Sequence, residues 1–168
     1  MRTYRRFKRW TTRAFLLLVV LMVAQACMTS EDTTTLPNNT TRTITKVVDG
    51  DTITLDGGEK IRLIGVDTPE VYGGKQCFGP ESSAYTKSLL KPGTQVRVEL
   101  DKDHLDSYSR TLAYIYRVDD GLFVNADLIA NGYAREIYYA PNGAHRSEFQ
   151  TLQSQAQLKK LGRWAACP

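Results

Sequence analysis

Apolar and polar residues alternate with a period of two along several short stretches of the chain after residue 42. Alternation of this kind, rich in β-branched residues, is typical of strands with one buried face. Tight turns at Asp49-Gly50-Asp51 and at Asp56-Gly57-Gly58-Glu59 separate the first three stretches, as in a meander. The pattern predicts five strands, over residues 43–48, 52–55, 60–66, 94–100 and 111–118.

The spacing of apolar residues changes to that of helices at three places. Pro80 suits the first turn of a helix, which we expect to run to about Lys91. Asn125 is placed to cap a short helix that stops at Gly132. The last helix is predicted over residues 144–161, with one apolar face. This order of elements predicts an α+β domain, and five short strands with glycine turns suit a small closed barrel.

The first 26 residues have a different composition from the rest. A basic stretch is followed by an apolar run over residues 14–24 that is short for a membrane span, and then by Ala24-Gln25-Ala26. We interpret residues 1–26 as a signal peptide, which predicts export to the periplasm, the cell envelope or the extracellular space. An uncleaved membrane anchor is the alternative interpretation of the same run.

Cys27 directly follows this segment. Residues 23–27 resemble the lipobox of bacterial lipoproteins, whose cysteine is lipid-modified, so Cys27 is a candidate lipidation site. Alternatively, a general signal peptidase cuts after Ala26 and Cys27 is simply the first mature residue. Residues 27–42 are rich in Ser, Thr and Asn and are predicted to be a flexible linker, suited to tether the domain of residues 43–168 to a surface.

The net charge is unevenly distributed along the chain. There are 22 basic and 18 acidic residues, but six of the basic ones and none of the acidic ones lie within residues 1–26. The remainder therefore carries 16 basic and 18 acidic residues, a formal charge of about −2. A domain that holds nucleic acid through a large positive surface is excluded, and any attraction for phosphate must be local.

Cys77 and Cys167 are the other two cysteines. In an exported domain an even pair favours a disulfide, which would tie the C-terminal end of the chain to the loop after Glu70. Two unpaired thiols are the alternative. A zinc site is not supported, because three scattered cysteines and two distant histidines lack the spacing of zinc ligands.

Two acidic turns stand at the ends of predicted strands. Asp51 shares a strand face with apolar residues, and a carboxylate there is costly unless a cation or hydrogen bonds compensate for it. Asp67-Thr68-Pro69-Glu70 follows the third strand, and its oxygen atoms are of the kind that Ca²⁺ or Mg²⁺ binds. Arg62 and Arg110 carry guanidinium groups, which pair well with phosphate. Each feature alone also fits an ordinary turn or a surface arginine.

Six segments, taken in order, resemble the staphylococcal nuclease family over most of the chain, from about Thr43 to Trp164. They are Val48–Thr52, Arg62–Glu70, Phe78–Glu81, Asp106–Arg110, Leu112–Tyr116 and Val124-Asn125. The resemblance implies an OB-fold, which is a five-stranded β-barrel, with three packed helices. It also implies Ca²⁺-dependent hydrolysis of DNA and RNA that leaves 3′-phosphate ends.

The resemblance implies roles for five residues around the scissile phosphate. Asp51 and Asp67 would bind Ca²⁺ through their side chains and Thr68 through its carbonyl oxygen. Arg62 and Arg110 would bracket the phosphate. Such an arrangement neutralises the charge of a phosphodiester, which otherwise repels an attacking hydroxide.

Three more residues complete the implied site. Glu70 would be the general base or the group that orients the attacking water. Tyr108 would lie beside the terminal phosphate or the sugar of the nucleotide, and Tyr138 aligns with a tyrosine of the nucleotide pocket. The loop from Val71 to Phe78 departs from the staphylococcal protein, because it is shorter and contains Cys77.

Two other functions are compatible with the sequence. A barrel of this type can bind nucleic acid without cleaving it, using aromatic residues and a basic groove, and a surface lipoprotein can use the barrel as a spacer. Clustered acids such as Asp51 and Glu70 favour the enzyme, since a binding module gains little from carboxylates that face phosphate. The sequence thus predicts a monomeric exported nuclease that contacts a membrane only through its signal peptide or a lipidated Cys27.

Overall fold

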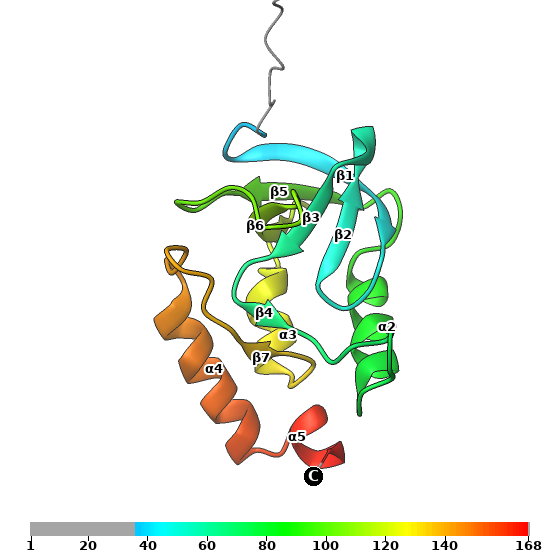
Figure 1. Cartoon of the computed structure of the whole chain (residues 1–168), viewed down its shortest axis with the longest axis vertical. Coiled ribbons are helices and arrows are strands. Elements are labelled where there is room, and N and C mark those ends of the chain that lie inside the picture. Colours follow the sequence, from blue (N-terminus) through cyan, green and yellow to red (C-terminus); the bar gives the residue numbers. More distant parts are fainter. Residues whose placement is uncertain (1–35, 168) are drawn as a thin grey trace, which may run out of the picture. The chain divides into compact units, whose positions relative to one another are not determined.

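Five strands close into a barrel in the order β1-β2-β3-β6-β5 in the computed structural model, which describes residues 36–167 (Figure 1). Their bounds are β1 Thr40–Val47, β2 Thr52–Leu55, β3 Lys60–Leu63, β5 Gln95–Glu99 and β6 Thr111–Arg117. Neighbouring strands are antiparallel except β3 and β6, which are parallel. Apolar side chains such as Ile53, Ile61 and Val98 are fully buried in the core. The α+β class and the five-stranded OB-fold barrel predicted from the sequence are confirmed.

The first strand begins earlier than the sequence pattern predicts. Thr40 already pairs with Val98 on β5, the Asn38 side-chain oxygen accepts a hydrogen bond from the Leu100 N–H at 2.8 Å, and Leu36 is buried. Residues 36–42 therefore belong to the folded domain, which corrects the predicted linker boundary at residue 42. The predicted signal peptide and Cys27 lie outside the described residues.

The strand predicted over residues 60–66 is broken into two. β3 ends at Leu63, and Gly65 adopts a φ of +76°, a conformation that favours glycine. A Cβ at Gly65 would lie 2.5 Å from the Phe149 ring, so this position has no room for a side chain either. The chain then leaves the barrel as β4 (Val66–Asp67), which pairs with β7 (Arg135–Glu136) in a separate two-stranded sheet.

The three predicted helices are present, and a fourth short helix follows them. Their bounds are α2 Gly79–Leu89, α3 Val124–Ala130, α4 Arg146–Leu158 and α5 Arg163–Ala166, and a 3-10 turn covers Asp56–Gly58. Figure 1 shows α3 beneath the barrel, where it contacts α2, α4 and β6. The last helix predicted over residues 144–161 is shorter at both ends, with Phe149 and Ala156 buried. Among residues 36–167, no helix has the length and apolar character needed to cross a membrane.

Asn125 does not cap α3, contrary to the sequence-based expectation. Phe123 occupies the N-cap position, and Asn125 is fully buried with its side chain engaged elsewhere. Its amide nitrogen donates to the Ile64 carbonyl oxygen at 2.9 Å, and its side-chain oxygen accepts from the Ile115 N–H at 2.9 Å. One side chain therefore joins α3 to β6 and to the turn between β3 and β4.

Asp101 connects the end of β5 to the loop that precedes α4. Its carboxylate accepts hydrogen bonds from the Tyr114 hydroxyl at 3.0 Å and from the Ala144 N–H at 3.1 Å. Burial alone would raise the pKa of Asp101, but hydrogen bonds from Ala144, Tyr114 and the Lys102 N–H outweigh it and hold that pKa below its ordinary value. The charged form of Asp101 is thus stabilised by folding.

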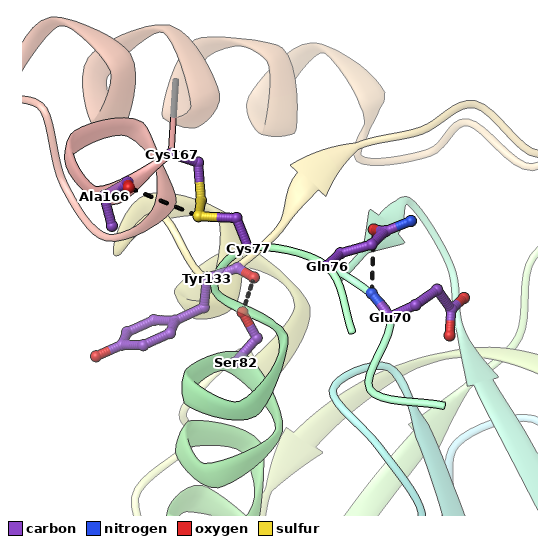
Figure 2. Close-up of a disulfide and its surroundings, with 7 residues drawn as sticks. All are labelled: Glu70, Gln76, Cys77, Ser82, Tyr133, Ala166 and Cys167. Atoms are coloured by element: carbon purple, nitrogen blue, oxygen red, sulfur yellow. Dashed lines mark hydrogen bonds between the residues drawn. A yellow bond between two sulfur atoms is a disulfide. The ribbon is translucent and has the colours of Figure 1, made fainter. Parts of the chain in front are cut away.

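A disulfide joins Cys77, in the loop before α2, to Cys167, which follows α5 (Figure 2). The two cysteines are 90 residues apart in sequence. The pairing expected from the sequence is therefore the one that the structure contains, and it ties the C-terminal end of the domain to the loop after Glu70.

Candidate active site

The turn between β1 and β2 presents Asp51 at one end of the barrel. The Asp49 carboxylate accepts hydrogen bonds from the backbone N–H groups of Asp51 and Thr52, at 3.2 Å and 2.8 Å, which fixes the turn. The buried Thr86 hydroxyl of α2 donates to the Gly50 carbonyl oxygen at 2.7 Å. The helix therefore holds this turn from one side.

Thr68 lies against the same turn. Its backbone N–H and its hydroxyl both donate to one carboxylate oxygen of Asp51, at 3.0 Å and 2.8 Å. A Cβ at Gly50 would lie 2.5 Å from the Thr68 hydroxyl oxygen, so the close approach requires glycine there. Burial raises the pKa of Asp51, although the Arg62 charge and the Thr68 N–H act in the opposite direction.

Arg62 on β3 is buried, with 5% of its surface exposed. Its Nη1 donates to the carbonyl oxygens of Leu63 and Val66, at 3.1 Å and 2.6 Å, and so closes the turn after β3. Its Nη2 lies 3.2 Å from an Asp51 carboxylate oxygen and 3.7 Å from one of Asp67. Because Nη1 serves the two backbone carbonyls, Nη2 is the nitrogen that faces the two carboxylates.

Arg110 approaches the site from the far side of the barrel end. Its Nε donates to Asp106 at 2.7 Å, and Asp106 also accepts the Arg110 backbone N–H at 2.9 Å. Its Nη1 donates to the Thr52 hydroxyl at 3.2 Å, and that hydroxyl donates to Asp51 at 3.2 Å. A continuous chain of contacts therefore runs from Arg110 through Thr52 and Asp51 to Arg62.

Glu70 is exposed and lies close enough to the other acids to be affected by them. The pKa of Glu70 is raised, mainly because its carboxyl group is partly buried. The negative charges of Asp51, Asp49 and Asp67 raise it further. The Arg62 charge opposes this effect only in part. A carboxylate with a raised pKa is a better proton acceptor than an ordinary one, which suits a general base.

Arg135 is a member of the site that the sequence did not indicate. Its Nε donates to an Asp67 carboxylate oxygen at 2.6 Å, while the other Asp67 oxygen faces Arg62. The two residues are opposite each other in the β4–β7 pair. They are far apart in sequence, and only the pairing of the small sheet brings them together.

The predicted tyrosines lie in different surroundings. Tyr108 is 79% exposed, with the Arg110 guanidinium 5.4 Å from its ring centre. Tyr138 instead lies against Arg146 of α4, whose guanidinium is 4.1 Å from its ring centre. The neighbouring residue, Tyr139, is the one whose ring faces Arg62, at 5.5 Å. The structure thus places Tyr139, and not Tyr138, beside Arg62, because successive side chains in this extended segment point to opposite sides.

The acidic groups at the site fit a hard divalent cation. Asp51 and Asp67 both approach one nitrogen of Arg62, and the Thr68 carbonyl oxygen accepts no hydrogen bond from residues 36–167. Ca²⁺ is bound by such carboxylates, by backbone carbonyls and by water. Among the described residues, no three His, Cys, Asp or Glu side chains gather into a metal site. A cation here would therefore need the carbonyl, water or substrate oxygens as further ligands.

This arrangement combines three chemical capacities at one end of the barrel. Two guanidinium groups are fixed beside the acids, Asp51 and Asp67 carry the type of oxygen that binds a hard cation, and Glu70 can accept a proton. Fixed arginines and a cation are what stabilise the charge that builds up during transfer at phosphorus.

Comparison with known proteins identifies a matching family and several similar proteins. Residues 60–166 match the model of a protein family described as staphylococcal nuclease homologue. The chain is 39% identical over 127 residues to a thermonuclease of Staphylococcus intermedius, an alignment that spans 72% of this chain and 74% of the relative. It is 38% identical over 134 residues to a thermonuclease of Staphylococcus hyicus, covering 76% of this chain and 78% of the relative.

A third relative is an endonuclease of Bacillus subtilis, 34% identical over 135 residues, of which the match spans 72% of this chain and 11% of the relative. The family match covers well over half of the chain and includes both arginines and the acidic turn after β3. The chain therefore belongs to the staphylococcal nuclease family.

Proposed function

We propose that this chain is a nuclease that hydrolyses phosphodiester bonds of DNA and RNA with the help of Ca²⁺ and leaves 3′-phosphate ends. One observation carries the proposal, namely that Arg62 lies directly against Asp51 while Arg110 is joined to Asp51 through the Thr52 hydroxyl, beside Asp67 and Thr68. A purely structural turn would not need two arginines and several carboxylates at the same place. The nuclease names of its relatives support the same activity.

The arginines act on the charge of the substrate. A phosphodiester repels an attacking oxygen, and negative charge grows on its oxygens as the attack proceeds. Arg62 is rigid, because its own backbone contacts hold it, and Arg110 is braced by Asp106 and Thr52. Their N–H groups therefore need no rearrangement at the moment of reaction, which is the condition for effective electrostatic stabilisation.

Glu70 acts on the water. In the proposed step the water loses a proton to the Glu70 carboxylate while its oxygen forms a bond to phosphorus, and the bond from phosphorus to the 5′ oxygen breaks. The 5′ oxygen takes up a proton from a solvent water and leaves as a hydroxyl, so the phosphate stays on the 3′ side.

Asp51, Asp67 and the Thr68 carbonyl are the groups that would hold a calcium ion. When bound, the ion would supply positive charge beside the scissile phosphate. Burial is the largest cause of the raised pKa of Glu70, and the ion would offset only the further part that comes from the charges of Asp51, Asp49 and Asp67. Tyr108 and Tyr139 flank Arg110 and Arg62 and offer aromatic surfaces to a nucleotide.

The test is a cleavage assay on single-stranded DNA and on RNA with added Ca²⁺, with EGTA, and with Ca²⁺ restored. Cleavage that EGTA abolishes and Ca²⁺ restores, with 3′-phosphate ends on the products, supports the proposal. Binding without cleavage would instead support a nucleic-acid-binding module. The absence of both binding and cleavage would support a spacer. An Asp51→Asn variant tests the cation site directly, since it keeps the size of the side chain and removes a charged cation ligand.

We also propose that the nuclease acts outside the cytoplasm as a monomer. The basic and apolar leader, the Ala24-Gln25-Ala26 sequence and the disulfide-forming pair are consistent with export. Mass spectrometry of the mature N-terminus distinguishes the possibilities, because a diacylated Cys27, an unmodified Cys27 and an intact leader have different masses. Gel filtration with light scattering tests the oligomeric state.

A further inference from the structure

Gln76 holds the backbone of Glu70 on both sides of the residue. The Gln76 side-chain oxygen accepts a hydrogen bond from the Glu70 N–H at 3.1 Å, a contact drawn in Figure 2. The Gln76 backbone N–H donates to the Glu70 carbonyl oxygen at 3.0 Å. The Gln76 carbonyl oxygen in turn accepts the Gly79 N–H at 3.1 Å, so Gln76 links Glu70 to the first residue of α2.

Gly79 confirms how closely the start of α2 approaches Glu70. A Cβ at Gly79 would lie 2.5 Å from the Glu70 carbonyl oxygen, closer than Cβ atoms come to other atoms in proteins. The backbone of Glu70 is therefore fixed by groups on the far side of its loop rather than by the loop itself.

The loop between Glu70 and Gln76 offers little support of its own. Gly73 and Gly74 have φ values of +78° and +138°, and neither has any atom within 4 Å of a Cβ placed there. Residues 72–77 are exposed. The position of Glu70 consequently depends on how firmly the far end of the loop, at Gln76, is held.

The residue after Gln76 is Cys77, whose disulfide to Cys167 anchors that end of the loop covalently (Figure 2). Two weaker anchors follow in the chain. The Phe78 and Tyr133 rings lie 5.6 Å apart, and the Ser82 hydroxyl donates to the Tyr133 carbonyl oxygen at 2.6 Å. Of these anchors the disulfide is the nearest to Gln76 in the chain.

We propose that Gln76 is a positioning residue for Glu70, and that the Cys77–Cys167 disulfide keeps Gln76 in place so that its reduction slows cleavage. The inference rests on the proposed function, in which Glu70 is the proton acceptor. Reduction adds two electrons and two protons to the disulfide and yields two thiols, while a dithiol such as dithiothreitol is oxidised to its own disulfide.

The first test compares Gln76→Leu with Gln76→Glu. Leucine removes the acceptor for the Glu70 N–H, whereas glutamate retains a side-chain oxygen at that place. We expect kcat to fall about tenfold in the leucine variant, the effect of one lost hydrogen bond, with KM unchanged because the proposed role of Gln76 acts through Glu70. The glutamate variant should recover most of kcat. Equal kcat in the wild type and the leucine variant overturns the proposal.

A matched control is Gln153→Leu. The Gln153 side-chain oxygen also accepts a backbone N–H from a glutamate, Glu136 on β7, at 2.7 Å. This variant loses the same kind of bond at a different glutamate and should keep kcat within about twofold. If both leucine variants lose kcat equally, the effect is one of general loosening and the proposal fails.

The second test concerns the disulfide. We expect dithiothreitol to lower the kcat of the wild type several-fold at a temperature where circular dichroism shows a folded protein. A Cys167→Ser variant should have the lower kcat from the start and should not respond to the reagent. In Gln76→Leu, reduction should lower kcat by a smaller factor than in the wild type, because the contact that the disulfide protects is already absent.

The outcomes separate this inference from the function on which it rests. If no form of the protein cleaves nucleic acid, the proposed function itself is wrong. If Glu70→Gln abolishes cleavage while reduction and Gln76→Leu leave kcat unchanged, only the positioning role is refuted.

Discussion

Replacement of Asn125 by alanine is the most direct test of how the fold holds the site. Its fully buried side chain satisfies the Ile64 carbonyl oxygen and the Ile115 N–H, each at 2.9 Å. The substitution leaves both backbone groups without these partners. The Ala113 carbonyl oxygen lies 3.4 Å from the Asn125 amide nitrogen, so it loses only a long hydrogen bond. It keeps its hydrogen bond from the Ile64 N–H at 3.0 Å.

The magnitude follows from the cost of unsatisfied groups. Each buried backbone group that loses its partner costs about 1–3 kcal/mol, and water that enters the vacated space recovers part of this. We therefore expect Asn125→Ala to lower the free energy of unfolding by about 3 kcal/mol. A domain with ordinary stability of about 5–15 kcal/mol would remain folded at 25 °C.

Urea unfolding followed by tryptophan fluorescence measures the change. Gln157→Ala, at an exposed position of α4, is the control and should stay within about 0.5 kcal/mol of the wild type. Because the Ile64 carbonyl belongs to the turn that leads to Asp67, the variant should also cleave more slowly under conditions where it is fully folded. A loss of less than about 1 kcal/mol would refute the cross-linking role of Asn125.

Three further predictions concern stability. The double variant Cys77→Ala/Cys167→Ala should lose about 4 kcal/mol in denaturant unfolding, since the disulfide closes a loop with a sequence separation of 90, and an unchanged midpoint would contradict this. Gly65→Ala should lower the melting temperature by several degrees, through its positive φ and its lack of space, and a wild-type melting curve would show that the turn can relax. The pKa of Asp101 is lowered by folding, so its contribution is present above about pH 4 and is lost as the pH falls further. The difference in stability between the wild type and Asp101→Asn should therefore shrink between pH 7 and pH 3, and a constant difference would contradict the hydrogen-bond account.

The barrel could be predicted because its signals are local. The barrel strands are short β-rich runs, with clear alternation of apolar and polar residues in β5, and the turns between the first three carry glycine and aspartate. The break at Gly65 could not be predicted in the same way. It depends on Phe149, which α4 brings against the turn, and on β7, which draws the next two residues out of the barrel. Neither partner is near Gly65 in sequence.

The same distinction applies to the site. Asp51, Arg62, Asp67 and Glu70 stand in short motifs, so their types and spacing could be recognised. Arg135 could not be predicted, because a lone exposed arginine on a two-residue strand has no distinguishing pattern. Only the β4–β7 pairing identifies Asp67 as its partner.

Thr52 and Tyr139 were missed for reasons of geometry. Thr52 is next to Asp51 in the chain, yet its hydroxyl matters because Arg110 reaches it from a distant loop. Tyr138 was predicted for the nucleotide pocket, but the sequence did not show which of Tyr138 and Tyr139 faces Arg62. A one-residue shift there moves the ring from the site to α4.

The most direct measurement is kcat for Ca²⁺-dependent cleavage of single-stranded DNA by Arg110→Ala and by Arg117→Ala. Both arginines are partly exposed and paired with a nearby aspartate, but only Arg110 is joined to Asp51 through Thr52. Removal of one charge-stabilising donor should lower kcat about 10²–10³-fold for Arg110→Ala, and Arg117→Ala should match the wild type. Equal activity in the two folded variants would contradict the assignment of this site.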